Sequence, residues 1–450
     1  MERFEYYGDL EKVVRGTGEL ILKNGNRHNV NFEIAKRGEE KLLFNIISNG
    51  DDALNTFPLL KSNGLDRIEG FDYDGRKVQV TGLFAKDSTV GTKTDSKVFL
   101  NGYAGICEIG EKVFSDGYIA QFDLINFLFL GNESVVKETE KGEILSRSLL
   151  QLQFPDFECN IEQTNDYSVA KQLLKRQGGV LKTSTLSTKV HSQNDYDSAL
   201  KKIRKLCQLL SVARSTFINW GSCRVYNNEG DVIYEFHGNA LTQPYHGSNL
   251  IDELPAETES FLKCAWIEYD KFEETFDLKR FLYGYADTYI NSYIETRCLN
   301  IAVLTESLSS RWAINEGRDI FFNEKEFNKH LSNLKKGIED ILLKTFDSIK
   351  KSYTQVMLSK VKDFNRRPLN WKLKRLRKAF HCPITDKEIK RFVSLRDHLA
   401  HSSLFPENED NVNAFLFMRH FLDRLVLSVL GYSGNYFDME TREEKSLLNN

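Results

Sequence analysis

The chain has 450 residues, 41% of them apolar and 28% charged, which is the ordinary composition of a globular protein of two or three domains. The formal net charge is −3, so nucleic-acid binding would need a local basic patch. No apolar run approaches the roughly 20 residues of a membrane span, and the start lacks a secretion-signal profile. The seven cysteines form no CxxC pair, which argues against a zinc site or disulfide framework and predicts a cytoplasmic protein with reduced thiols.

The first half of the chain has the pattern of β-strands. Strand-like runs are bounded by turn formers, including an Asn-Gly signal at 24–25, and they lie at 18–24, 27–38, 77–85, 97–110 and 118–131. A helical patch at 195–212 places five apolar residues on one face, Leu200, Ile203, Leu206, Leu209 and Leu210. Two further strand-like runs follow this patch, and 241–249 has the composition of a connector. We expect a β-rich N-terminal domain over 1–245.

From about residue 255 the apolar spacing becomes that of helices. The predicted helical segments are 254–274, 277–312, 324–346, 370–380, 385–402 and 410–431. They predict an all-helical domain over 255–435. The fold class expected for the whole chain is α+β, a β-rich N-terminal domain followed by an all-α helical bundle.

Several catalytic signatures are absent from the sequence: GxxxxGK[ST], GxGxxG, HExxH and GxSxG. Their absence weakens nucleotide hydrolysis, dinucleotide redox chemistry, zinc proteolysis and α/β-hydrolase chemistry. What remains is an arginine followed by a histidine after four to six residues. About one such pair is expected by chance, whereas the chain has three, Arg375/His381, Arg391/His398 and Arg396/His401.

The sequence around the third pair favours it over the others. Phe392, Leu395 and Leu399 stand at i, i+3 and i+7, so the segment is predicted to be a helix with one buried face. The two serines and the Phe-Pro-Glu-Asn run that follow end this helix and place His401 at its terminus. On a straight helix a five-residue step turns by about 140° beyond one full turn, so Arg396 and His401 share a face only if the terminus frays or kinks.

Three residue types needed for phosphodiester cleavage meet in this segment. Arg396 supplies a guanidinium fork for a phosphate, and His401 an imidazole that can transfer a proton near neutral pH. Asp397 stands four residues before His401, where its carboxylate can accept a ring proton and fix the tautomer. An alternative interpretation is an ordinary helix end, with the arginine paired to a nearby acid and the histidine in solvent.

The run Arg396-Asp397-His398-Leu399-Ala400-His401 resembles the R-(polar)-x-x-x-H motif of the HEPN superfamily. Many members of that superfamily are RNases of toxin–antitoxin, CRISPR-associated and antiphage systems. The layout of a β-rich front and a helical back is similar to the ApeA-type antiphage proteins. The start is similar too, with Tyr7-Gly8-Asp9-Leu10 and then Gly16-Thr17-Gly18-Glu19-Leu20 opening a strand.

The resemblance implies a metal-independent endoribonuclease that needs no cofactor. In HEPN nucleases a histidine acts as general acid or base while the 2′-hydroxyl attacks the adjacent phosphorus, and an arginine stabilises the phosphate. The products carry 2′,3′-cyclic phosphate and 5′-hydroxyl ends, and the cleft usually forms between two protomers. Carried over, Arg396 would hold the phosphate and His401 would transfer the proton. Many members have Asn after the arginine, whereas Asp397 here can either orient His401 or repel RNA.

Two further features bear on RNA. Glu306 lies in an upstream helix where related proteins often carry a polar or acidic residue, and it is a supporting candidate or simply an exposed helix residue. The stretch 366–378 has seven basic residues in thirteen and no acid, with a tryptophan on which a base can stack. Its candidate RNA-binding residues are Arg366, Arg367, Trp371, Lys372, Lys374, Arg375, Arg377 and Lys378. The alternative is a solvated helix face.

The sequence and the resemblance together predict an abortive-infection-type antiphage protein of the cytoplasm. Its HEPN domain would cleave RNA, with tRNA as one candidate, as a homodimer or higher homo-oligomer. The N-terminal domain would sense a phage component and restrain the nuclease until infection. The alternative is a catalytically silent HEPN module that dimerises or binds RNA or protein partners.

Overall fold

The computed structural model describes residues 10–38, 41–49, 64–90, 97–139, 142–238, 243–245, 249–289, 293–346, 351–407 and 409–447. Residues 7–9 of the N-terminal resemblance, and most of the connector at 241–249, lie outside the described residues. The chain divides into two compact units, Met1–Lys263 and Cys264–Asn450, and the division falls inside helix α4 (Pro255–Phe276). Among the described helices, none combines the length and apolarity needed to cross a membrane.

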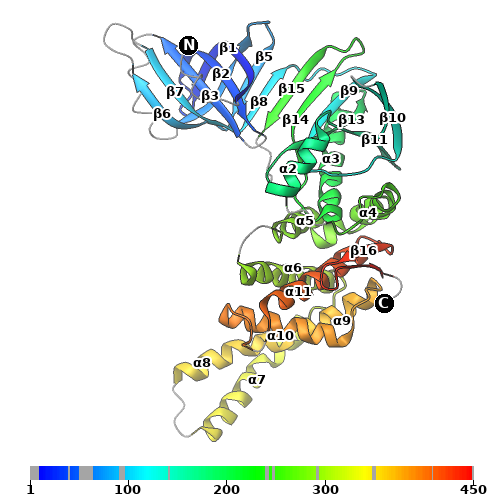
Figure 1. The fold of residues 1–450 in the computed structure, drawn as a ribbon. Coiled ribbons are helices and arrows are strands. Elements are labelled where there is room, and N and C mark those ends of the chain that lie inside the picture. The colour runs from blue at the N-terminus through cyan, green and yellow to red at the C-terminus, as the bar shows by residue number, and fades with distance from the viewer. Residues whose placement is uncertain are drawn as a thin grey trace. The chain divides into compact units, whose positions relative to one another are not determined.

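The first unit is built on one sheet of fifteen described strands, and every pairing between them is antiparallel (Figure 1). The strands are β1 (Leu10–Leu22), β2 (Arg27–Arg37), β3 (Lys41–Asn49), β4 (Leu65–Asp72), β5 (Lys77–Thr81), β6 (Phe84–Val90), β7 (Lys97–Ala104), β8 (Ile106–Gly110), β9 (Tyr118–Ile125), β10 (Glu133–Thr139), β11 (Gly142–Phe154), β12 (Phe157–Gln163), β13 (Lys182–Val190), β14 (Asn219–Tyr226) and β15 (Val232–Gly238). Their spatial order is β10-β11-β12-β13-β9-β14-β15-β8-β5-β4-β1-β2-β3-β7-β6.

The hairpin of β1 and β2 shows how the sequence produces this sheet. The Asn-Gly signal forms the turn, where Gly25 adopts a positive φ of 87° that a residue without a side chain reaches easily. From Val30 to Ile34 every second residue of β2 is buried, as expected for a strand with one face on a core. That core lies between strands β1–β8 and contains fully buried side chains such as Ile34, Leu42 and Ile68.

The later strands of the sheet are packed by helix α3 (Gln193–Arg214), which contacts β13 and β14. Of the five predicted core residues on this helix, all but Leu200 are fully buried. Ser192 caps its first turn by accepting a hydrogen bond from the backbone N–H of Asp195, and the helix ends where Ser215 turns left-handed. A second helix, α2 (Tyr167–Gln177), lies between β12 and β13 in the sequence.

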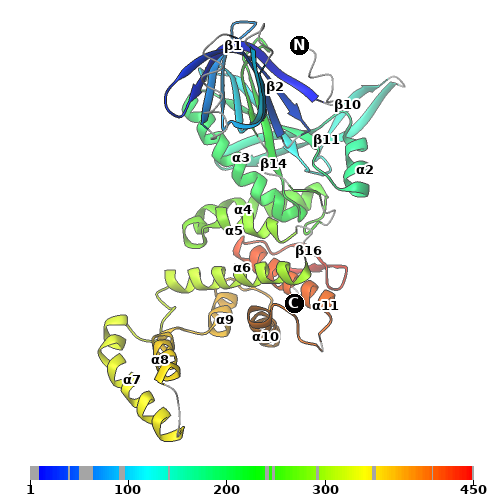
Figure 2. The same ribbon diagram turned by 90° about the vertical axis from the view of Figure 1, so that its left-hand side faces the viewer.

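The second unit consists of helices followed by a short hairpin. The helices after α4 are α5 (Leu278–Asp287), α6 (Ile294–Asn315), α7 (Glu324–Thr345), α8 (Lys351–Lys360), the 3₁₀ helix η2 (Val361–Asn365), α9 (Leu369–Ala379), α10 (Asp386–Ser402) and α11 (Asn411–Val429). Helix α6 packs against α5, α9, α10 and α11, and Figure 2 shows it lying across α9 and α10. The hairpin of β16 (Asn435–Asp438) and β17 (Glu443–Ser446) completes the unit.

The α+β class predicted from the sequence, a β-rich N-terminal part followed by helices, is confirmed. Some details differ from the expectation. The predicted helical segment 277–312 is two helices, α5 and α6, and the hairpin β16–β17 starts where the predicted helical range ends. All seven cysteines are free thiols, and six of them are buried.

Candidate functional site

Helix α10 carries the Arg396/His401 pair, and its ends follow from the sequence. Thr385 accepts a hydrogen bond from the backbone N–H of Glu388, whose side chain in turn binds the Thr385 backbone, so that a capping box starts the helix. The helix ends at Ser403, which is left-handed with a φ of 59°. Phe392, Leu395 and Leu399 are buried, which leaves the motif residues on the flanks and on the outer face.

Arg396 is held by two carboxylates. Its Nη1 lies 2.8 Å from Oδ1 of Asp397, and its Nη2 donates to Oε2 of Glu306 on helix α6. Partial burial opposes the charge on Arg396, but the hydrogen bonds to Asp397 and Glu306 outweigh burial and raise the pKa of the guanidinium. The supporting candidate Glu306 therefore contacts Arg396 directly, although ninety positions separate them in the chain.

His401 is exposed in the last turn of α10, and the helix continues without a break through Ser402. The fraying or kink that would bring His401 onto the face of Arg396 does not occur in this described segment, so the two side chains point about 140° apart around the axis. In the described structure Asp397 binds Arg396 and makes no hydrogen bond to His401. The predicted orientation of His401 by Asp397 is therefore absent from a single chain, because the neighbouring guanidinium takes the carboxylate.

The basic stretch 366–378 contacts helix α6 close to Glu306. Lys372 Nζ lies 3.1 Å from Oγ of Ser310, which stands one turn after Glu306 on the same helix. The first turn of α9 and the second half of α10 thus reach neighbouring positions of α6. Lys372 and Arg396 therefore contact residues that stand one turn apart on α6.

The remaining residues of the stretch fall into two groups. Arg367 is held in place, since its Nε donates to the Ile320 carbonyl and its guanidinium lies 4.5 Å from the ring of Phe321 and 4.2 Å from that of Trp371. Arg375 lies 5.3 Å from the same Trp371 ring. A base that stacks on Trp371 would therefore compete with a guanidinium. Arg366, Arg375 and Lys378 are exposed, while Lys374 and Arg377 pair with Asp386.

The two other Arg/His pairs have different surroundings. Arg391 forms an ion pair of 2.5 Å with Glu409 and lies over the ring of Phe417, and His398 is exposed on α10. Arg375 and His381 both line a pocket at the end of α9. Among the residues that the structure describes, neither pair contacts a carboxylate from α6.

Sequence reasoning missed a buried ion pair inside α11. Arg419 Nη2 lies 2.9 Å from Oδ1 of Asp423, and both side chains are almost fully buried. The hydroxyl of Tyr285 on α5 donates to the same carboxylate at 2.6 Å, and the guanidinium of Arg419 lies 3.6 Å from the ring of Tyr289. Burial raises the pKa of Asp423. The visible signal is the pair of opposite charges at i and i+4 within a segment rich in apolar residues.

A second buried group joins α11 to the C-terminal hairpin. His420 Nδ1 lies 3.2 Å from Oδ1 of Asp438, and burial, followed by the charge of Arg424, lowers the pKa of His420 to about 4. The ligand atoms of His420, Asp438 and Glu440 lie within 4.8 Å of one another, the spacing of a metal site. The ammonium of Lys445 already pairs with Asp438, so a cation stands where a metal ion would bind. We interpret this group as structural.

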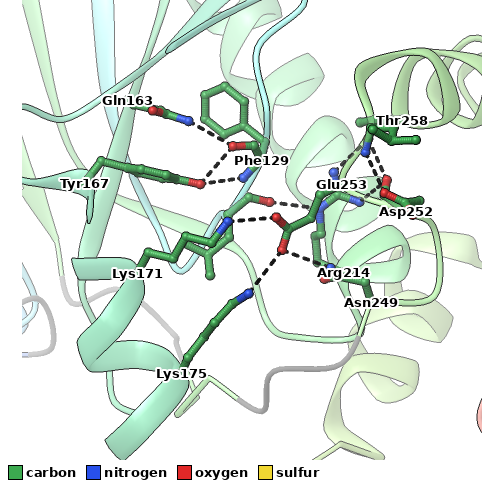
Figure 3. A network of polar contacts seen from close by, with 12 residues as sticks. Phe129, Gln163, Tyr167, Lys171, Lys175, Arg214, Asn249, Asp252, Glu253 and Thr258 are labelled. Carbon is green, nitrogen blue, oxygen red and sulfur yellow. Dashed lines mark hydrogen bonds and ion pairs between the residues drawn. The ribbon is translucent and has the colours of Figure 1, made fainter. Parts of the chain in front are cut away.

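The polar network of the first unit centres on Arg214, which is completely buried (Figure 3). Its Nε donates to the Leu128 carbonyl and its Nη1 to the Ile251 carbonyl, each at 2.9 Å, and its Nη2 donates to Thr258 Oγ1 at 2.7 Å. Burial lowers the pKa of Arg214 to about 10. Nearby, Glu253 accepts from Lys171 at 2.9 Å. Because the donors of Arg214 are bonded to the protein itself, this cluster fastens the start of α4 to α3.

The group at α6 and α10 combines a guanidinium, two carboxylates and a histidine with access to solvent. Such a set can bind a phosphate and transfer protons. Comparisons of the chain with protein-family models, curated proteins and solved structures found no match.

Proposed function

We propose that this protein is a metal-independent endoribonuclease of the HEPN type. The observation that carries the proposal is the group of Glu306, Arg396 and Asp397 beside an exposed His401, in a helical unit whose motif resembles that superfamily. Lys372 on α9, which contacts Ser310 one turn after Glu306 on α6, adds a second positive charge. RNA is the substrate that suits this set, because its 2′-hydroxyl supplies a nucleophile without a bound metal or cofactor.

In the proposed reaction the 2′-oxygen attacks the adjacent phosphorus and loses its proton to a base. The bond from phosphorus to the 5′-oxygen breaks, and that oxygen takes up a proton from an acid. The products are a 2′,3′-cyclic phosphate and a 5′-hydroxyl. His401 is the residue proposed for proton transfer, and Arg396 would stabilise the charge that develops on the phosphate.

The divergence of Arg396 and His401 on one straight helix supports a composite site. In such a site the histidine of one chain and the arginine of a second chain would face the same phosphate. The resemblance implies a cleft between two protomers, each of which gives an Arg/His pair. The proposed active form is therefore a homodimer or higher homo-oligomer that associates through the helical unit. In a monomer these two side chains would act on different faces of α10.

The proposed biological role is antiphage defence in the cytoplasm. Because an RNase that cleaves cellular RNA is toxic, the β-rich unit is proposed to restrain the helical unit until a phage component is sensed. tRNA is one candidate substrate. If the isolated helical unit is no more active than the full chain, this restraint is wrong.

A second candidate function is a catalytically silent module that binds RNA or a protein partner. The specific observation in its favour is that Glu306 and Asp397 together outnumber the single charge of Arg396. A phosphate would have to displace at least one of them. This candidate predicts RNA binding that depends on 366–378 without any cut products.

The deciding experiment incubates purified full-length protein with total bacterial RNA in EDTA, with and without phage lysate. The variants are His401→Ala, Arg396→Ala and, as a matched control, His330→Ala on α7, which is equally exposed. We expect cleavage by the wild type and by the control, leaving cyclic-phosphate ends, and none by the other two variants. RNA that stays intact in every reaction, while binding persists, would favour the silent module.

A further inference from the structure

A pocket lies where α9 ends and the chain turns into α10. Most of the side chains that line it are basic, and Leu447 of the C-terminal segment also lines it. The basic residues are Lys374, Arg375, Arg377 and Lys378, joined by His381. Four cations around one concavity are expected to attract an anion.

Ion pairs within the protein neutralise only part of the positive charge of this pocket. Asp386 pairs with Lys374 and with Arg377, each at 2.8 Å. Lys378 and His381 are exposed and make no ion pair or hydrogen bond within the described part of the chain. Arg375 contacts only the ring of Trp371 there. One carboxylate therefore faces four cations, and the excess charge sits on residues that are free to bind.

The turn that presents His381 is fixed from several sides. The N–H of Cys382 donates to the Arg377 carbonyl at 2.9 Å, and Arg377 Nη1 donates to the Ile384 carbonyl at 2.9 Å. Arg424 on α11 donates to the Pro383 carbonyl at 2.6 Å. His381 itself has a φ of 50°, a left-handed conformation that is unfavourable for a residue with a side chain. Such a conformation persists only where the surrounding structure holds it, so the imidazole is pre-positioned at the pocket.

We infer that this pocket binds a phosphate group of the RNA strand that is cleaved at Arg396, at a point several nucleotides away from the scissile bond. The inference rests on the proposed function for the identity of the strand. Along α10, Asp386 and Arg396 stand ten residues apart, which is about 15 Å. A phosphate in the pocket thus cannot be the one that reacts. The pocket adds affinity for RNA long enough to reach both places, and a dinucleotide gains nothing from it.

The test measures RNA binding by the full-length chain in a His401→Ala background, so that the RNA stays intact. The pocket variant is Lys378→Gln/His381→Asn, since asparagine tolerates the left-handed turn. The matched control is Lys329→Gln/Lys336→Gln on α7, where both lysines are exposed in the same unit. The probes are a fluorescent 20-nucleotide unstructured RNA, a dinucleotide, inorganic phosphate and ADP. Thermal melting checks that each variant is folded.

In the pocket variant we expect about tenfold weaker binding of the 20-nucleotide RNA near 0.1 M salt, and a salt-dependence slope lower by about 1. The advantage of this RNA over the dinucleotide should shrink by the same factor, while the control binds like the parent. Equal RNA binding by the pocket variant and the parent would overturn the inference. Pocket-dependent binding of ADP or phosphate, with RNA binding independent of the pocket, would assign the pocket to a small phosphorylated molecule instead.

The two proposals fail separately in this design. If the wild type cleaves RNA and the pocket variant binds RNA normally, the proposed nuclease activity is supported and the proposed role of the pocket is wrong. If the wild type never cleaves RNA but the pocket variant binds RNA about tenfold more weakly, the proposed nuclease activity is wrong and the proposed role of the pocket is supported.

Discussion

Glu306 on α6 and Arg396 on α10 share a hydrogen bond although they stand ninety positions apart in the sequence. The contact fixes the guanidinium that is the proposed phosphate ligand, and Asp397 fixes it from the other side. Both carboxylates remain about half-exposed, at 42% and 52% of their side-chain surface. Water screens such pairs, so a phosphate can exchange with them at modest cost.

Replacing Glu306 with glutamine should strengthen RNA binding. The amide keeps a hydrogen-bond acceptor for Arg396 but removes a negative charge that competes with the phosphate. An exposed ion pair is worth up to about 1 kcal/mol, so we expect a gain of about two- to fivefold in affinity, measured in the His401→Ala background. The control is Glu339→Gln on α7, which is exposed in the same unit. Unchanged affinity in Glu306→Gln would mean that Arg396 does not bind the phosphate.

The two histidines at the end of α10 provide an internal comparison. His398 and His401 are both exposed on the same helix, but only His401 stands at the motif spacing from Arg396. Loss of a general acid or base typically lowers the rate by about 10²–10⁴-fold. We expect that loss in His401→Gln and less than a threefold change in His398→Gln, measured as initial rates of RNA cleavage in EDTA. The opposite ranking would transfer the proton-transfer role to His398.

The sequence predicts the helices of the site well because their signals are local. Helices α9, α10 and α11 begin and end within about two residues of the predicted bounds, as their apolar spacing and caps indicate. Helices α2 and α8, of eleven and ten residues, have no counterpart among the predicted elements. The hairpin β16–β17 consists of two strands of four residues, too short for a period-2 pattern to stand out.

The contacts within the candidate site lie beyond such local signals. Residue spacing can place Asp397 next to both Arg396 and His401, but only the folded geometry shows that Arg396 takes the carboxylate. The pairing with Glu306 depends on how α6 crosses α10, which no sequence period encodes. The buried ion pair of Arg419 and Asp423 leaves a trace in the sequence, whereas its partner Tyr285 comes from another helix.

Arg214 should be essential for the stability of the β-rich unit. Replacing it with methionine leaves the carbonyls of Leu128 and Ile251 without their donor in a dry interior. Each unpaired buried polar group costs about 1–3 kcal/mol, so we expect a loss of at least about 3 kcal/mol in the free energy of unfolding. The measurement is urea unfolding followed by the β-sheet circular dichroism signal. Arg204→Met, an exposed position on α3, is the control and should stay within about 0.5 kcal/mol of the wild type.

The ion pair of Arg419 and Asp423 should show strong coupling in a double-mutant cycle. Removing Arg419 alone leaves a carboxylate buried at 3% exposure, which should cost about 3–5 kcal/mol. The double variant Arg419→Leu/Asp423→Leu removes both charges and should cost clearly less than the sum of the single changes. Urea unfolding followed at 222 nm gives the four free energies. Additive losses would mean that the two side chains do not stabilise each other.

His420 should make the helical unit lose stability in mild acid. Burial lowers its folded-state pKa to about 4, whereas a histidine in the unfolded chain titrates near 6.5. As the pH falls below about 6.5, His420 binds a proton in the unfolded chain but stays neutral in the folded chain. The free energy of unfolding therefore decreases until about pH 4. The expected loss between pH 7.5 and 5.5 is about 1.4 kcal/mol.

The measurement compares urea unfolding of the wild type and His420→Gln at these two pH values, with His330→Gln on the exposed face of α7 as the control. The glutamine variant should lack the 1.4 kcal/mol dependence, since a side chain that cannot titrate takes up no proton in either state. Both pH values lie above the range in which carboxylates usually bind a proton, so Asp438 contributes little to the difference in stability between them. A wild-type stability that is equal at both pH values would show that His420 is charged in the folded protein, with Asp438 as its counter-ion.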